Sequence, residues 1–200
     1  MLGDIILLNR KKGGWFSAAQ RFFTQMNYTH STFSIGTILG IESVLSADEK
    51  VVIEPLKKYF EEDGTEIEIW RINENIIDAK NKPLLEQKIS EIYYKYSNSY
   101  YGFFQVIWFI YRWINEKFFK RDVRRKNNPF KRGIICSELV YYYLIELEKI
   151  LNKTLKKGKI RFDVLLPLQA ELSKYTPDTI HAGDIAQILN KNNKLFYKLN

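Results

Sequence analysis

The stretch Gly133-Ile134-Ile135-Cys136-Ser137-Glu138-Leu139-Val140 leads into a long helical pattern. Apolar residues recur at helical spacing after the cysteine: Leu139, Val140, Tyr143, Leu144, Leu147, Ile150 and Leu151. The pattern predicts an amphipathic helix that begins at Cys136. Exposed N–H groups and the helix dipole stabilise a thiolate at such a position, so Cys136 is a candidate nucleophile. The alternative interpretation is a small core residue beside two isoleucines.

Cysteine and histidine are the scarce residues of the chain. Among 200 residues there are one cysteine and two histidines, His30 and His181. A single cysteine excludes a disulfide within the chain, and this set is too small for a cysteine-rich zinc site with four ligands. The sequence implies no metal and no organic cofactor. Thiol chemistry would have one nucleophile and two candidate imidazoles.

The rest of the sequence predicts a mixed chain. Strand-like patterns occur in residues 4–9, 31–39, 51–54 and 66–72, and acidic, polar residues 46–50 predict a turn. Helical patterns occur in residues 15–26, 81–96 and 100–118, and Thr176-Pro177-Asp178 predicts a helix start. No linker or shift in composition divides the sequence. We predict an α+β protein with a single domain over residues 1–200.

Two further residues could act with the cysteine. His30 stands where a loop enters a predicted strand, and an imidazole there could serve as general base to a cysteine at a helix N-terminus. Glu54 ends the next predicted strand, and its carboxylate could hold the imidazole in the useful tautomer. The alternatives are a surface histidine at a strand edge and a solvated carboxylate at a strand end.

Taken in order, these segments resemble a known family. Gly3-Asp4-Ile5-Ile6-Leu7, Thr29-His30-Ser31, Val52-Ile53-Glu54, Ile135-Cys136-Ser137-Glu138-Leu139-Val140 and Thr176-Pro177-Asp178 follow one another as in the circularly permuted papain-like amidases. These are the YiiX/YaeF-like group of the NlpC superfamily of cysteine peptidases. The resemblance covers about residues 3 to 180. Residues 97–132 look like an aromatic and basic insertion.

The resemblance implies a fold, a reaction and a triad. The fold would be a permuted papain-like, NlpC-type one, in which a small and mostly antiparallel sheet packs against the nucleophile helix. Cys136 would be the nucleophile, His30 the base and Glu54 the residue that orients His30. The reaction would be hydrolysis of an amide bond, in a cell-wall peptide or an acylated small molecule, through an acyl-enzyme. The runner-up is a lipid acyltransferase or deacylase with the same dyad.

The chain also departs from the family pattern. Many members have Tyr-Asp in the segment before the cysteine, whereas this chain has Tyr100-Tyr101-Gly102-Phe103. A role for an aspartate there is lost, and one of the two tyrosines is a candidate to line the site. His181 competes with His30, because it follows Cys136 as in unpermuted enzymes. We interpret His181 instead as the end of a helix, where a histidine is favourable for dipole reasons alone.

Positive charge is concentrated in one segment. The net charge is +8, and eight cations fall within residues 117–132: Lys117, Lys120, Arg121, Arg124, Arg125, Lys126, Lys131 and Arg132. Next to the aromatic segment, they fit a surface that meets an anionic membrane or cell-wall polymer. The alternative is a solvated loop after a core helix. No nucleic-acid-binding motif accompanies the charge, so we rank nucleic acid below these partners.

Two expectations concern location and class. The N-terminus has no basic start followed by a long apolar stretch, and no run reaches the roughly 20 apolar residues of a membrane span, so the sequence as given predicts a cytoplasmic protein. The reading that competes with an enzyme is a non-catalytic module that binds anionic surfaces and uses Cys136 only structurally.

Overall fold

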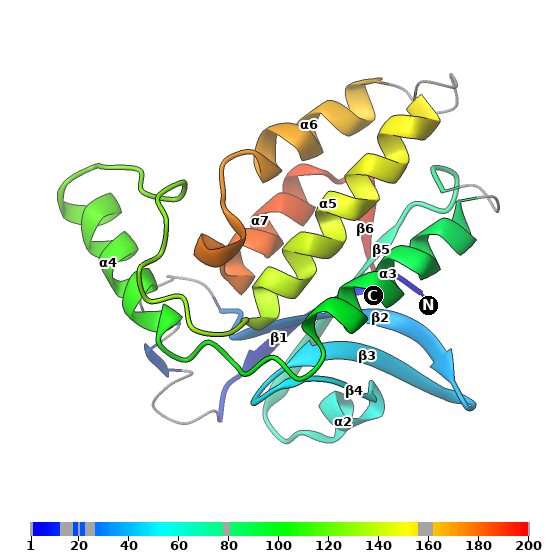
Figure 1. Cartoon of the computed structure of the whole chain (residues 1–200), viewed down its shortest axis with the longest axis horizontal. Helices are drawn as coiled ribbons and strands as arrows, with labels where there is room; N and C mark the ends of the chain where they lie inside the picture. Colours follow the sequence, from blue (N-terminus) through cyan, green and yellow to red (C-terminus); the bar gives the residue numbers. More distant parts are fainter. Residues whose placement is uncertain are drawn as a thin grey trace.

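The structure, a computed structural model, describes residues 2–12, 18–19, 21–22, 27–77, 81–155 and 162–199. The strands are β1 (Ile5–Arg10), β2 (His30–Ile38), β3 (Ile41–Ala47), β4 (Val51–Pro55), β5 (Thr65–Ile72) and β6 (Phe196–Leu199). The helices are α2 (Lys57–Glu61), α3 (Lys82–Tyr96), α4 (Gln105–Phe118), α5 (Cys136–Leu155), α6 (Phe162–Leu172), the 3-10 turn η1 (Pro177–Thr179) and α7 (Ala182–Lys191). Figure 1 shows helices α3, α5, α6 and α7 above the sheet and α2 below it.

The six strands form one sheet in the order β4-β3-β2-β1-β5-β6. Every adjacent pair among these strands is antiparallel. Alternation along β1 divides the apolar residues between two cores, as the two-residue period of a strand requires. Ile5 and Leu7 join the large core under α5, whereas Ile6 and Leu8 join a smaller core with Tyr59 of α2. The predicted α+β class with a small, mostly antiparallel sheet is confirmed.

Helix α5 is the central element above the sheet. It packs on β2 and α3, and its apolar stripe is buried throughout, including Leu139, Tyr143, Leu144 and Leu147. The helix begins at Cys136, as the sequence predicts, and runs four residues beyond the predicted stripe to Leu155. Its first turn therefore reaches the sheet next to the start of β2 (Figure 1).

Most of the other predicted elements are present, but the sequence analysis missed α2, α6, α7, β6 and the strand β3. The structure places residues 46–47 at the end of this strand rather than in a turn. Strands β2 and β3 form a hairpin in which Ile38 pairs with Ile41. Leu39 and Gly40 both have positive φ angles, 50° and 82°, as a two-residue hairpin turn requires. Leu-Gly lacks the Asn or Asp that usually marks such a turn, so the sequence does not indicate a hairpin here.

Three further predictions can be compared with the structure. The predicted helix 100–118 starts later, at Gln105, because Tyr100 and Tyr101 form isolated bridges to Lys50 and Ile134. Thr176 precedes a 3-10 turn. Most of the predicted helix 15–26 lies outside the described residues. The four residues of this range that are described, 18–19 and 21–22, are helical. Within the described residues, every helix is too short or too polar to cross a membrane.

Candidate active site

Cys136 and His30 meet where the start of α5 lies against the start of β2. Each is the first residue of its element, and both are buried, with 4% and 2% of their surfaces exposed. The thiol and the imidazole are hydrogen-bonded to each other, and the backbone N–H of Ser31 also donates to the sulfur. The two residues that the sequence analysis paired therefore lie in contact.

The electrostatics of this pair favour a thiolate beside an imidazolium. Burial alone lowers the pKa of His30, but the Cys136 thiolate, its hydrogen bond and the Asp48 charge outweigh burial, and the pKa rises above its ordinary 6.5. Burial likewise raises the pKa of Cys136, but the His30 charge, its hydrogen bond and the Ser31 N–H lower it below 9.0. The opposite shifts widen the pH range in which both groups are charged.

On its other side the imidazole is held by a chain of hydroxyl groups. His30 Nε2 lies 2.9 Å from Ser46 Oγ, Ser46 Oγ lies 2.8 Å from the Tyr59 hydroxyl, and that hydroxyl lies 2.6 Å from Glu54 Oε1. Since Glu54 can only accept, Tyr59 donates to Glu54, Ser46 donates to Tyr59, and His30 Nε2–H donates to Ser46. This order leaves Nδ1 as the nitrogen that faces the thiol.

Two hydroxyl groups, those of Ser46 and Tyr59, thus separate Glu54 from the imidazole that it would contact directly in the predicted triad. Ser46, at the end of β3, is the residue hydrogen-bonded to Nε2. Glu54 ends the chain of hydroxyl groups, and its ion-pair partner is Lys58, near the start of α2. Although burial raises the pKa of Glu54, the hydrogen bonds that it accepts from Lys58 and Tyr59 lower it overall, which keeps the carboxylate charged.

Asp48 is a site residue that the sequence analysis did not single out. Its Oδ1 lies 3.7 Å from His30 Nδ1, on the side of the ring where the thiol lies. Arg10, at the end of β1, holds both carboxylate oxygens at 3.2 and 3.3 Å. Burial raises the pKa of Asp48, but His30 and Arg10 lower it overall. Asp48 therefore adds a fixed negative charge that stabilises the imidazolium.

A large cavity borders His30, and a separate, smaller crevice borders Cys136. A cavity of about 630 Å³ is lined by His30, Asp48, Arg10 and Glu54, among others. A much smaller crevice is lined by Cys136, Ser137 and His181. Thr29 and Tyr101 line both, so these two side chains separate the cavity from the sulfur. Of the two tyrosines considered above, Tyr101 is the one that lines the crevice.

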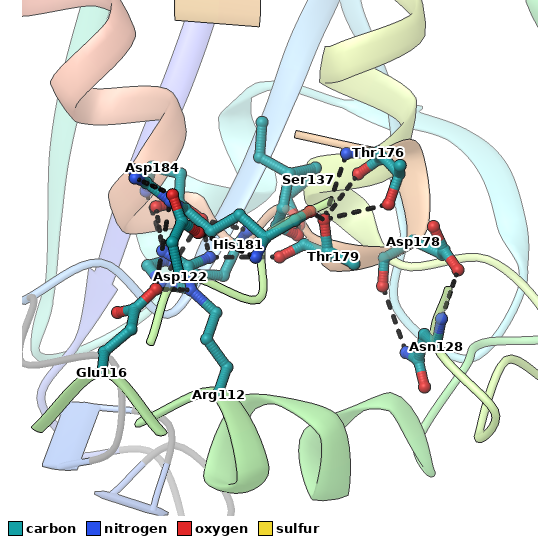
Figure 2. A network of polar contacts seen from close by, with 12 residues as sticks. Arg112, Glu116, Asp122, Asn128, Ser137, Thr176, Asp178, Thr179, His181 and Asp184 are labelled. Atoms are coloured by element: carbon teal, nitrogen blue, oxygen red, sulfur yellow. Dashed lines mark hydrogen bonds and ion pairs between the residues drawn. The ribbon is translucent and has the colours of Figure 1, made fainter. Parts of the chain in front are cut away.

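His181 lies near the cysteine but has a different role from His30. Rather than ending a helix, it is the N-cap of α7, and its Nδ1 accepts a hydrogen bond from the Asp184 backbone N–H. Figure 2 shows it within a network of polar contacts that includes Arg112 and Asp184. Burial lowers the pKa of His181 to about 4. A histidine that is neutral at pH 7 and bound to a backbone N–H is poorly suited to be the base.

Other known proteins offer limited similarity. No protein-family model and no curated protein matches the sequence. The chain is similar to the crystal structure of metalloprotein YiiX from Escherichia coli O157:H7, with a TM-score of 0.44 and 18% identity over 70% of this chain and 91% of that chain. Within the described part of this chain, no three His, Cys, Asp or Glu side chains converge as metal ligands would.

Proposed function

We propose that this protein is a cysteine-dependent hydrolase of the permuted papain-like type that cleaves an amide bond through an acyl-enzyme on Cys136. The observation that carries the proposal is the buried contact of Cys136 with His30, in which the pKa of the thiol is lowered and that of the imidazole is raised. A purely structural cysteine in an apolar core would show the opposite shift, because burial disfavours the thiolate.

Cys136, His30 and Ser46 have distinct roles in the proposed reaction. The Cys136 thiolate attacks the carbonyl carbon, a C–S bond forms, and His30 Nδ1–H gives its proton to the leaving nitrogen as the C–N bond breaks. Water then attacks the thioester, His30 takes a proton from it, and the C–S bond breaks to release the acid and restore the thiolate. Ser46 accepts from Nε2–H throughout, which holds the ring in one orientation.

The start of α5 is suited to stabilise the oxyanion of this reaction. Backbone N–H groups in the first turn of a helix have no acceptor within the helix. Those beside Cys136 would donate hydrogen bonds to the carbonyl oxygen as negative charge develops on it. The helix dipole has the favourable sign at the same place.

The cavity beside His30 supports a peptide-like or otherwise polar substrate. Its lining carries both signs of charge: Arg10, Lys50 and Lys58 are basic, and Asp48, Glu49 and Glu54 are acidic. Such a lining complements a ligand with both kinds of group better than a purely apolar chain. A cell-wall peptide or a polar acylated small molecule remains the substrate class of the proposal.

The test combines thiol reactivity with acyl-enzyme trapping. The rate of Cys136 alkylation by iodoacetamide is measured between about pH 5 and about pH 9, where an ordinary thiol titrates near 8.5. In the unmodified protein alkylation should persist well below that pH, and His30→Gln should return it to the ordinary profile. His181→Asn is the matched control and should leave the profile unchanged. Mass spectrometry with an activated amide should find an acyl group on Cys136, and Cys136→Ala should carry none.

Two results would overturn the proposal. One is a thiol with ordinary reactivity that does not respond to His30→Gln. The other is a reactive thiol that activated amides and esters never acylate.

A further inference from the structure

Helix α4 has an unusual distribution of polar and apolar residues. Gln105, Trp108, Phe109, Arg112 and Asn115 face the protein and are buried. Phe104, which precedes the helix, and Ile107, Tyr111, Ile114 and Phe118 are between 37% and 64% exposed. The exposed residues recur every three or four positions, so they form one continuous stripe, called here the apolar row. The side that faces solvent is thus the more apolar one.

The inward face of α4 is fixed by polar contacts, so the apolar row is held outward. Arg112 makes two hydrogen bonds to the carboxylate of Asp184, at 2.6 and 2.9 Å, and a third to the backbone carbonyl of Thr179. Figure 2 shows these contacts joining α4 to η1 and to the start of α7. Rotating the helix to bury the apolar row would break a buried ion pair, which is strongly unfavourable.

Cations border the apolar row at both ends. Lys117 lies over the ring of Trp113, 4.8 Å from its centroid, and Arg132 lies over the ring of Phe104 at 5.7 Å. The loop that follows α4, residues 120–132 and called here the basic loop, exposes Lys120, Arg121, Arg125, Lys126, Lys131 and Arg132. The acid of this loop, Asp122, is paired with Arg124. An apolar stripe edged by cations combines the two features that attract a protein to an anionic bilayer.

We propose that α4 and the basic loop form a docking surface for a lipid bilayer with anionic headgroups. The apolar row would enter the interface, and the cations of the basic loop would contact the headgroups. Helix α4 has 14 residues and is about 21 Å long, shorter than the roughly 30 Å hydrocarbon core, so it would lie in the plane of the interface. Figure 1 shows α4 and the basic loop at one end of the molecule, away from β3 and β4.

Docking in this way would bring the cavity beside His30 close to the bilayer. Phe103, two residues before α4 and 54% exposed, lines that cavity. The residue next to it, Phe104, begins the apolar row. If the proposed hydrolase activity holds, its substrates would include acylated molecules at a membrane surface. Docking itself needs no active thiol.

The experiment is vesicle co-sedimentation of the full chain. Vesicles of phosphatidylcholine alone are compared with vesicles in which about a third of the lipid is phosphatidylglycerol. We expect binding to the anionic vesicles that salt weakens, and at least tenfold weaker binding to the neutral ones. Ile114→Ser with Phe118→Ser should weaken binding by at least about tenfold, since each buried apolar side chain contributes that order of affinity. Arg125→Glu with Lys126→Glu should weaken it on anionic vesicles.

Matched substitutions elsewhere serve as controls. Leu39 is 97% exposed in the β2–β3 turn, and Leu39→Asn should leave binding unchanged. Lys149→Glu with Lys153→Glu changes charge on α5 and should have little effect. Cys136→Ala should bind as well as the unmodified protein, which separates docking from catalysis.

Four outcomes would overturn the docking proposal. The first is no preference for anionic vesicles. The second is an equal effect of the α4 and Leu39 substitutions. The third is a dimer in sedimentation velocity that Phe118→Ser dissociates, because the apolar row would then be covered by a second copy. Tight, salt-sensitive binding to DNA with no binding to vesicles would likewise assign the cations to a nucleic acid.

Discussion

The imidazole of His30 lies between a thiol and a hydroxyl, and that position defines what each neighbour contributes. Cys136 is on one side and Ser46 on the other, with Asp48 3.7 Å from Nδ1. A serine in the orienting position is neutral, so the negative charge that supports the imidazolium comes from Asp48 and the thiolate. The site therefore separates the orienting group from the charged group, which one aspartate supplies in the serine-protease triad.

This separation predicts unequal effects of two substitutions. Ser46→Ala removes the acceptor of His30 Nε2–H and leaves a buried N–H unpaired, which costs about 1–3 kcal/mol and should slow Cys136 alkylation at neutral pH roughly tenfold or more. Glu54→Gln keeps an oxygen that can accept from Tyr59, so the loss should stay below about threefold. Alkylation rates by mass spectrometry, with circular dichroism to check the fold, measure both. Equal losses in the two variants would contradict the assigned order.

His181 predicts a pH dependence of stability. Its pKa in the folded protein is about 4, below the ordinary 6.5, because the ring is buried beside Arg112 despite the opposing charge of Asp184. Protonation therefore favours the unfolded chain. The stability is fully present above about pH 6.5 and is lost as the pH falls towards 4, by up to about 3 kcal/mol.

The variant that isolates this effect is His181→Asn. Asparagine can cap α7 in the same way but does not titrate. Urea unfolding of both proteins should show a free-energy difference that shrinks or reverses between pH 6.5 and pH 4 in favour of the variant. A constant difference across that range would mean that His181 is not the titrating group. His30 titrates in both proteins, so its contribution cancels.

At the residue scale, sequence could indicate some of the site and not the rest. Cys136 and His30 were predictable because a helix start and a strand start are visible in the pattern of apolar residues. Ser46 and Asp48 were not, because Ser46 lies near the end of β3 and Asp48 directly follows it, and the hairpin turn that precedes β3 lacks the usual residues. Their roles depend on where β3 is held by pairing with β2 and β4, which is a long-range property.

The orientation of α4 depends on one buried ion pair. Its apolar row faces outward, so the pair of Arg112 with Asp184 fixes an orientation that apolar packing alone would oppose. Both side chains are nearly fully buried. Asp184 also accepts from the His181 backbone N–H, so the same carboxylate completes the cap of α7. One pair thus joins α4, the start of α7 and the crevice beside Cys136.

Arg112→Met should therefore be severely destabilising. Removing one partner of a buried pair leaves the other charge uncompensated, which costs about 3–5 kcal/mol. Arg124→Met is the matched control, since Arg124 pairs with an exposed aspartate, Asp122, and should cost less than about 1 kcal/mol. Urea unfolding monitored by tryptophan fluorescence gives both values. Similar losses in the two variants would show that the buried pair does not anchor α4.

At the scale of whole elements, prediction from sequence succeeded where packing follows a local period. Helices α3 and α5 and strands β1, β2, β4 and β5 have clear apolar patterns and formed near the predicted bounds. The sequence predicted an aromatic helix in 100–118 but not which side faces inward, because both sides of α4 are rich in apolar residues. The buried arginine settles the orientation, and its partner Asp184 is 72 positions away along the chain.

For the molecule as a whole, the path by which a substrate reaches the sulfur connects the structure with the proposed activity. Cys136 is 4% exposed, and the large cavity is lined by His30 rather than by the cysteine. Tyr101 and Thr29 line both the cavity and the crevice. Tyr101 lies in the segment just before α4. The helix proposed to dock on a bilayer is therefore directly connected to a residue that lines the crevice beside Cys136.

This arrangement predicts that Tyr101 limits the size of reagent that reaches Cys136. Tyr101→Ala should raise alkylation by a bulky N-aryl maleimide at least severalfold, while alkylation by the small iodoacetamide changes much less. Tyr100→Ala is the matched control. Tyr100 is the neighbouring residue and is 71% exposed, and it lines neither the cavity nor the crevice. Urea midpoints of both variants separate access from loss of packing. If both reagents accelerate equally in Tyr101→Ala, the tyrosine affects the reactivity of the thiolate rather than the path to it, and substrates must approach Cys136 from another side.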